Sequence, residues 1–187
     1  MRSLLASILV AGLLLATGCS HGGAPPAVAD PTRTPTTSPP IGTGPVAPAL
    51  PAVARRPTKA GAIAFAKYYW AVVDYAQKTG DTHLLRRIAN KTCRACDGGA
   101  DWIDKIHKRG GIIHGGSHTV RSADAQSAPT SAVKGSAFVV SLTVESAPDR
   151  VTGAGNLNSR DRGGPESLLM TVQWFSTWEI NSWLRPG

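Results

Sequence analysis

The sequence predicts an α+β fold in which three N-terminal helices pack on a curved antiparallel sheet. After residue 58, apolar residues recur at alternating three- and four-residue spacing, the period of an amphipathic helix. Over 138–145 and 168–174, apolar and polar residues alternate, the period of a half-buried strand. Because the helical segments precede the strands, the order favours helices gathered on one face of a sheet.

The first predicted helix follows Pro57, with Thr58 as its N-cap, and ends at Gly80. Its apolar residues form two neighbouring stripes, so we expect it to be largely buried. The first stripe is Ala62, Phe65, Tyr69, Val72 and Ala76, and the second is Ile63, Ala66, Trp70 and Val73.

Two shorter helices are predicted next. Asp81 caps the first of them, which covers 84–89. The third helix is expected to begin at Asp97, after the Cys93-Arg94-Ala95-Cys96 segment, and to stop at Gly110.

The rest of the chain predicts a meandering antiparallel sheet. Residues 112–122 form a weak first strand, 138–145 and 168–174 the next two, and 178–182 the last, after a bend at 175–177. Residues 149–165 show no periodicity and are rich in Gly, Asn and Arg, so we expect a long hairpin loop there.

The first residues carry the signal of an exported lipoprotein. Arg2 supplies a positive charge, 4–15 is almost wholly apolar, and Leu15-Ala16-Thr17-Gly18-Cys19 follows. The apolar run is shorter than the roughly 20 residues of a membrane span but fits a signal peptide. The segment resembles the bacterial lipobox, in which the Cys receives a diacylglycerol and becomes the N-terminus. An ordinary secretory signal followed by chance by Cys19 is the alternative.

We therefore expect a signal peptide over 1–18, a lipidated Cys19 with a linker to residue 57, and a folded domain over 58–187. The linker is rich in Pro, Ala and Thr and lacks aromatic residues, so it cannot bury enough apolar surface to fold. It predicts a disordered tether that holds the domain at the extracytoplasmic face of the cell membrane.

The chain has a net charge of +8, which becomes +7 when Arg2 leaves with the signal peptide. Positive charge beside an anchor favours contact with an anionic membrane, although a solvated basic surface explains it equally well. The basic residues are scattered and match no nucleic-acid-binding motif, so we expect no nucleic-acid partner.

Local motifs resemble an actinobacterial lipoprotein family of unknown function, DUF6318. The motifs are Phe65-x-x-Tyr68-Tyr69-Trp70, Tyr75-Ala76-x-x-x-Gly80-Asp81 and Cys93-x-x-Cys96. The element order and the closing Trp178-x-Ile180 strand are similar to the nuclear-transport-factor-2-like (NTF2-like) cone. This resemblance spans 58–184 and implies a curved sheet wrapped by helices, with a cavity between them. It implies no single activity, because that fold hosts enzymes and binding modules.

Cys93 and Cys96 are the two cysteines that remain when Cys19 is lipidated, and an oxidising location predicts a disulfide between them. A thiol–disulfide exchange site is an alternative, but such a motif should follow a strand, whereas this one joins two helices. Zinc binding with downstream histidines is another, but the spacing is not that of a zinc finger. We therefore expect no metal and no cofactor.

In isomerases and dehydratases with the NTF2-like cone, an Asp or a His–Asp pair acts in the cavity. Asp74, His114 and His118 are available here, and no spacing singles out a pair. His114 and His118 share strand parity, and exposed positions on one face are the simpler interpretation. The aromatic residues line a pocket or pack in the core. The candidate cavity residues are Tyr69, Trp70, Asp74, Trp102, His114, His118, Trp174 and Trp178.

Because no catalytic constellation is evident, we expect a non-catalytic binding or accessory module for an apolar ligand, a cell-envelope ligand or a protein partner. A small-molecule isomerase or hydrolase is the alternative, and it predicts a buried Asp–His pair in a deep cavity. A thiol–disulfide protein that uses Cys93 and Cys96 is a third hypothesis.

Mass spectrometry of the protein purified from its own membrane tests the first residues. We expect Cys19 to be the N-terminal residue and to carry acyl groups, and Cys93 and Cys96 to be oxidised to one disulfide. An unmodified Cys19, or a chain that begins elsewhere, would contradict the lipobox assignment.

Overall fold

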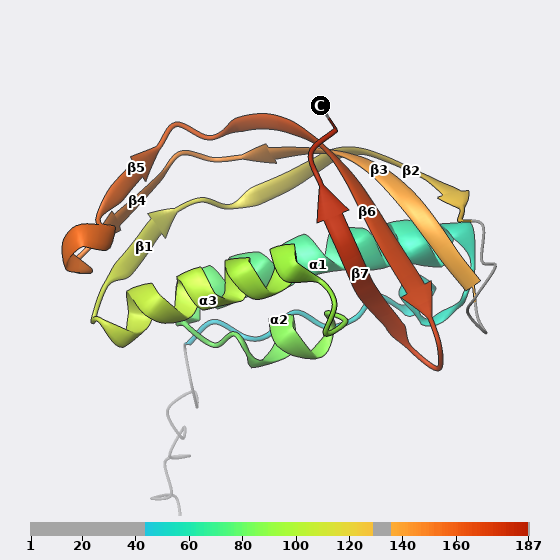
Figure 1. The fold of residues 1–187 in the computed structure, drawn as a ribbon, viewed down its shortest axis with the longest axis horizontal. Helices are drawn as coiled ribbons and strands as arrows, with labels where there is room; N and C mark the ends of the chain where they lie inside the picture. The colour runs from blue at the N-terminus through green and yellow to red at the C-terminus, as the bar shows by residue number, and fades with distance from the viewer. Residues whose placement is uncertain (1–43, 129–135, 187) are drawn as a thin grey trace, which may run out of the picture. The chain divides into compact units, whose positions relative to one another are not determined.

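The computed structural model describes residues 44–128 and 136–186, and the predicted signal peptide, Cys19 and most of the linker lie outside them. The described elements follow one another in the order shown in Figure 1. They are η1 (Ala52–Arg55), α1 (Lys59–Thr79), α2 (His83–Arg87), α3 (Arg94–Lys108), β1 (Ile112–Gly115), β2 (His118–Ser127), β3 (Ser136–Ser146), β4 (Asp149–Thr152), η2 (Gly155–Leu157), β5 (Ser159–Asp161), β6 (Gly164–Trp174) and β7 (Trp178–Leu184).

Helix α1 has the ends that the sequence predicts. The Thr58 hydroxyl accepts a hydrogen bond from the backbone N–H of Gly61 at 3.1 Å, and Gly80 closes the helix in the left-handed conformation with φ of 75°. Both apolar stripes are largely buried, as expected for a helix with apolar residues on two faces. No helix in the described part of the chain is long and apolar enough to span a membrane.

Helix α3 begins earlier than predicted. The expected start at Asp97 is wrong because Cys93 is the N-cap, and its sulfur accepts a hydrogen bond from the backbone N–H of Cys96 at 3.3 Å. The predicted disulfide between Cys93 and Cys96 is confirmed, with an S–S distance of 2.03 Å. The two cysteines therefore lie in the first turn of a helix, and not in a link between helices.

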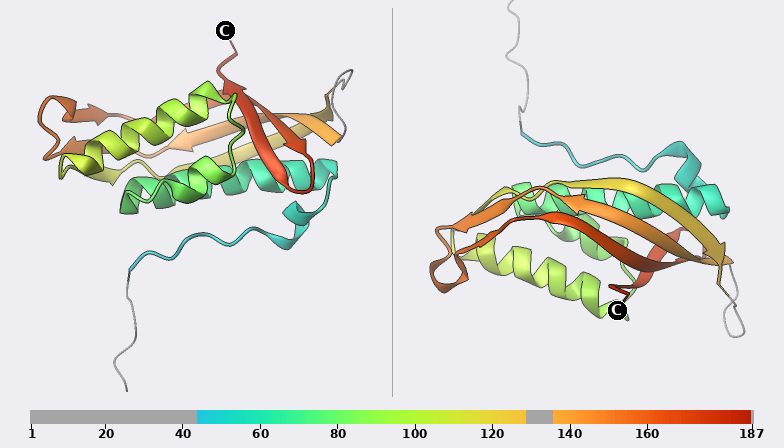
Figure 2. Two further views of the ribbon diagram at one scale, coloured as in Figure 1. Left: turned by 60° about the horizontal axis from the view of Figure 1, so that its bottom comes forward. Right: turned by 90° about the horizontal axis from the view of Figure 1, so that it is seen from above.

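The strands form two antiparallel sheets, with the orders β1-β4-β5 and β2-β3-β6-β7. The predicted single curved sheet of the NTF2-like cone is therefore wrong. The expected first strand over 112–122 is two strands, one in each sheet. The expected loop over 149–165 contains β4, η2 and β5, while the bend at 175–177 is confirmed. Figures 1 and 2 show the strands arching over α1 and α3.

The two sheets meet at a bend, where the chain passes from one sheet to the other between β1 and β2, between β3 and β4, and between β5 and β6. Gly115 has a φ of 78°, and a Cβ added to it would lie 2.2 Å from the carbonyl oxygen of Pro148. Gly163, with a φ of 65°, approaches the carbonyl oxygen of Ser146 equally closely. Only glycine combines left-handed φ with such contact, so these residues interrupt the regular ladder.

The core fills the space between the helices and the four-stranded sheet. Trp178 of β7 is 1% exposed and stacks on Phe65 of α1, with ring centroids 6.1 Å apart. Trp174 and Phe138 pack edge-on against the same indole at 5.3 and 5.9 Å. Aromatic contacts of this kind add to the stabilisation from burial.

The Gly115→Ala substitution tests whether the close approach at the bend is needed. Gly110→Ala is the matched control, because Gly110 has a similar φ of 75° and no heavy atom within 4 Å of an added Cβ. We expect the control to lower the free energy of unfolding by about 1–2 kcal/mol, because alanine must then adopt a left-handed backbone conformation. Gly115→Ala should cost about 1–3 kcal/mol more from overpacking. Urea unfolding measures both, and equal costs would contradict the close approach.

Candidate functional site

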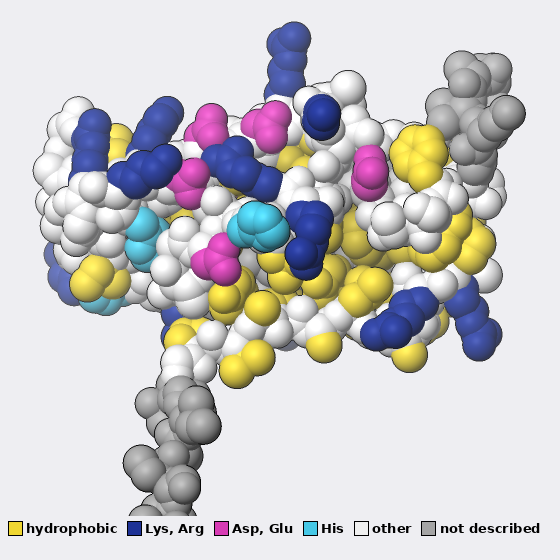
Figure 3. Space-filling view, turned by 90° about the horizontal axis from the view of Figure 1, so that it is seen from below, with side chains coloured by type: hydrophobic (Ala, Val, Ile, Leu, Met, Phe, Trp, Pro, Cys, Tyr) yellow, Lys and Arg dark blue, Asp and Glu magenta, His cyan; other side chains and the backbone are white. Residues whose placement is uncertain are grey.

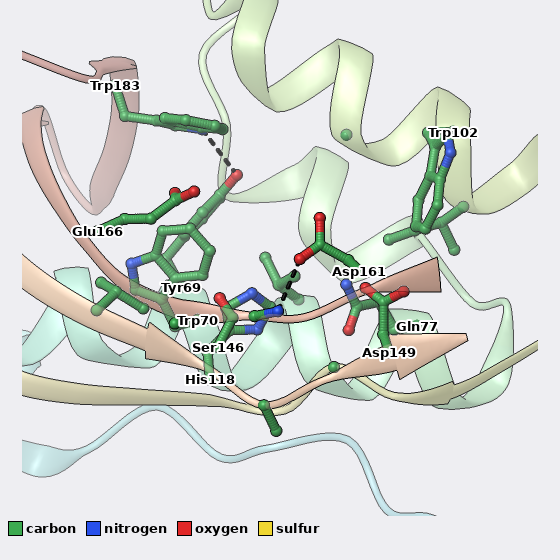
Figure 4. A pocket seen from close by; sticks show the side chains of 18 of the residues that line it. Tyr69, Trp70, Gln77, Trp102, His118, Ser146, Asp149, Asp161, Glu166 and Trp183 are labelled. Carbon is green, nitrogen blue, oxygen red and sulfur yellow. Dashed lines mark hydrogen bonds between the residues drawn. The ribbon is translucent and has the colours of Figure 1, made fainter. Parts of the chain in front are cut away.

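A pocket of about 430 Å³ lies under the bend between the two sheets. Its residues come from α1, α3 and both sheets, so the glycine-rich bend forms one wall and the helices form the other. Figure 4 shows aromatic side chains and carboxylates around this space. Its volume is typical of a site for a small molecule.

Aromatic side chains form much of the wall. Tyr69 and Trp70 are neighbours on α1, Trp102 comes from α3 and Trp183 comes from β7. The indole N–H of Trp183 donates to the Tyr69 hydroxyl at 3.2 Å. Burial raises the pKa of Tyr69 to about 12, although the hydrogen bond from Trp183 lowers it by a smaller amount. The hydroxyl is therefore neutral at physiological pH. The wall therefore presents large apolar surfaces, and Trp183 holds the Tyr69 hydroxyl in place.

His118 is fixed between the pocket and α1. Asp74 lies one helical turn after Trp70, and its carboxylate accepts hydrogen bonds from the His118 backbone N–H at 3.1 and 3.2 Å. The same carboxylate lies 2.6 Å from His118 Nδ1. The Trp70 and His118 rings are 4.7 Å apart, and the imidazole lines the pocket with its side chain 11% exposed. Asp74 therefore orients His118.

Two carboxylates meet where β4 and β5 pair. Asp149 begins β4 and lies directly opposite Asp161, the last residue of β5. Burial raises the pKa of Asp149, and the Asp161 charge raises it further, against smaller lowering by an Asp161 backbone hydrogen bond and by His118. Asp161 points toward the imidazole of His118 (Figure 4). A third carboxylate, Glu166, binds the Arg185 guanidinium at 3.0 and 3.1 Å.

The pocket wall also holds polar atoms without partners. Trp70 Nε1 and Gln77 Oε1 are buried and form no hydrogen bond within the described residues. Both residues line the pocket. Because buried polar groups are nearly always hydrogen-bonded, one free donor and one free acceptor in a pocket wall indicate a place for polar groups of a ligand or for water.

The structure separates the predicted cavity residues into three groups. Tyr69, Trp70, Trp102 and His118 line the pocket. Asp74 stands behind His118 and contacts its ring, so the structure brings together an Asp–His pair that no spacing in the sequence singles out, because its members lie 44 residues apart. His114 lies on β1 and bonds Thr152 Oγ1 at 2.9 Å on the exposed surface. It does not share a strand with His118 because the bend separates them.

Trp174 and Trp178 pack in the core through their T-shaped contact, so they are structural and not cavity residues. Cys93 and Cys96 are 0% and 1% exposed, which disfavours thiol exchange, since reactive cysteines are partly exposed. Sequence reasoning missed Asp149, Asp161 and Glu166 because two of them fall in the expected loop. Within the described residues, no three His, Cys, Asp or Glu side chains gather as a metal site.

Surface charges elsewhere are mixed. On the face seen in Figure 3, Lys and Arg side chains lie among Asp and Glu side chains. Arg86, for example, bridges Asp101 and Asp104 at 2.7 and 3.0 Å. By contrast, within the described residues neither Asp149 nor Asp161 forms an ion pair with Lys or Arg. The pocket mouth is therefore acidic on a basic protein.

Comparisons with known proteins give a family and a fold. The model of a family of unknown function (DUF6318) matches residues 43–179. None of the curated proteins compared matches the chain. Among solved structures, the intermembrane space region of the chloroplast protein ARC6 is similar, with a TM-score of 0.51 and 12% identity over 70% of this chain and 97% of that chain. At this identity the likeness concerns the fold alone, and it does not support the NTF2-like cone.

Asp149→Asn tests the electrostatic cost of the paired carboxylates. Because the folded protein raises the pKa of Asp149, its charged form is penalised above that raised pKa, and the penalty vanishes below the ordinary value of 3.8. We expect the free energy of unfolding of the variant at pH 7 to exceed that of the wild-type protein by up to about 1 kcal/mol. The gain should shrink as the pH falls. Urea unfolding across pH measures this, and a pH-independent loss of stability would contradict it.

Proposed function

The chain belongs to the DUF6318 family, whose function is unknown, and we propose that it is a lipid-anchored binding protein whose folded domain holds a small molecule of the cell envelope. The observation that carries the proposal is the pocket under the bend, with aromatic walls, acidic residues at its edge and buried polar atoms that have no hydrogen-bond partner among the described residues. Apolar walls with a few placed polar groups are the usual composition of ligand sites.

The proposed location rests on the N-terminal sequence. The segment before Cys19 resembles a lipobox, as in the actinobacterial lipoproteins that the motifs resemble, and the Pro-rich residues after it favour a tether. In this proposal, acyl chains on Cys19 hold the domain at the extracytoplasmic face of the cytoplasmic membrane. Two or more chains suffice for stable anchoring.

A binding role accounts for the Asp74–His118 pair without catalysis. Asp74 bonds the backbone and the ring of His118 together, so it fastens the first residue of β2 to α1. That contact fixes one edge of the pocket relative to the helix that carries Tyr69 and Trp70. A pre-formed site of this kind lowers the ordering cost of binding.

A second candidate function is a small-molecule isomerase or hydrolase. The observation that favours it is the same pair, because a carboxylate bonded to His Nδ1 orients an imidazole for proton transfer. In this role His118 is the general base facing the pocket, and Asp74 is a positioning residue that stabilises the imidazolium. The reaction would act on a bond near the His118 ring.

Native mass spectrometry of the protein purified from its own membrane tests the binding role. We expect a small-molecule adduct that Trp102→Ala reduces at least tenfold, because the substitution removes one aromatic wall. Phe175→Ala is the matched control, since Phe175 is an exposed aromatic residue that does not line the pocket. Circular dichroism confirms that both variants fold.

The same purified material separates the two candidates. Under the binding proposal, the released adduct keeps its mass when it is incubated again with the wild-type protein. Conversion that is lost in His118→Gln would favour the enzyme. An adduct that Trp102→Ala and Phe175→Ala affect equally would overturn the proposed site, as would the absence of any adduct.

A further inference from the structure

We propose that the pocket ligand is a small organic cation, an ammonium or amidinium group on an apolar body. This inference rests on the proposed binding function and names its ligand class. It follows from three features, which are two pocket carboxylates with no Lys or Arg partner in the described part of the chain, the aromatic walls of the pocket and the net positive charge of the chain.

The first feature is the pair Asp149 and Asp161. They face each other across β4 and β5, and the Asp161 charge helps to hold the pKa of Asp149 above its usual range. The chain has 20 Lys and Arg residues for 12 Asp and Glu residues, yet the described part of it places no Lys or Arg in an ion pair with either carboxylate. A cation from outside the chain would relieve this repulsion.

The second feature is the aromatic wall. The Trp70 and Trp183 ring centroids are 6.1 Å apart, and those of Tyr69 and Trp70 are 5.5 Å apart. Figure 4 shows Trp102 on the opposite side of the space from Trp183. Indole and phenol faces attract cations through their quadrupole, and Trp does so best. Carboxylates beside such faces recognise an ammonium more strongly than either group alone.

Other ligand classes fit less well. An anionic ligand would be repelled by the negative charges of Asp149 and Asp161. A metal ion needs several ligands close together, and the described residues provide no group of three. A neutral ligand could use the aromatic faces but would not offset the charge of the two carboxylates. An organic cation uses both features in a space of about 430 Å³.

Two probes of matched shape test the inference with the full-length protein. Isothermal titration calorimetry at pH 7 compares benzylammonium with benzyl alcohol, its neutral near-isostere. We expect benzylammonium to bind at least tenfold more tightly and to weaken as salt is added, because screening reduces charge attraction. Asp149→Asn combined with Asp161→Asn should bring its affinity down to that of the alcohol.

Asp97→Asn is the matched control, because it also removes a carboxylate charge, but from an exposed position on α3 outside the pocket. It should leave benzylammonium affinity unchanged. Both pocket substitutions keep an acceptor oxygen, so the hydrogen bond from the Gly163 backbone N–H to residue 161 is retained. Circular dichroism and urea unfolding check that the double variant folds.

The outcomes separate this inference from the proposed function. Equal affinity for the two probes would overturn the cation and leave a binding pocket. Binding of benzylammonium that the double variant does not weaken would place the cation elsewhere and overturn the inference. Binding of neither probe would also overturn it. The proposed function is tested separately, by the adduct found on the native protein.

Discussion

The close approach of strands at the bend governs the rest of this structure. Gly115 touches the carbonyl of Pro148, and Gly163 touches the carbonyl of Ser146, at separations that leave no room for a side chain. Backbone hydrogen bonds from Gly116 to Pro148 and from Ala147 to Ser117 keep the strands joined across this line. The arch therefore changes direction without opening, which satisfies the backbone polar groups that an abrupt break would leave unpaired.

The site exists because of that change of direction. His118 begins β2 and Asp149 begins β4, each just after the chain passes the bend, and Asp161 ends β5 just before it. All three residues therefore line the same pocket. The helices then close the space from the other side, with Asp74 holding His118 against α1. Residues that are far apart in sequence meet here because the interruptions in the strands coincide, and a flat sheet would have dispersed them.

Local signals were sufficient to predict both ends of α1 and the alternating residues of β3, β6 and β7. Thr58 and Gly80 act through hydrogen bonds within a few residues, so the sequence reveals both ends of α1. The bend depends on contacts between glycines and carbonyl groups of neighbouring strands, which are far apart in the sequence. The Asp74–His118 pair spans 44 residues for the same reason. Short strands such as β5, with three exposed residues, have no burial pattern to detect.

The segment before α1 has a mechanical consequence. Ala54 of η1 is fully buried, and the backbone of Arg56 lies so close to Gly61 that a Cβ there would lie 2.0 Å from its carbonyl oxygen. A pulling force that enters from the N-terminal side is therefore carried first by η1 and the start of α1. The aromatic and acidic residues of the pocket begin at Tyr69, more than two helical turns later. The contacts that fasten the N-terminal segment to the domain therefore lie apart from the residues that line the pocket.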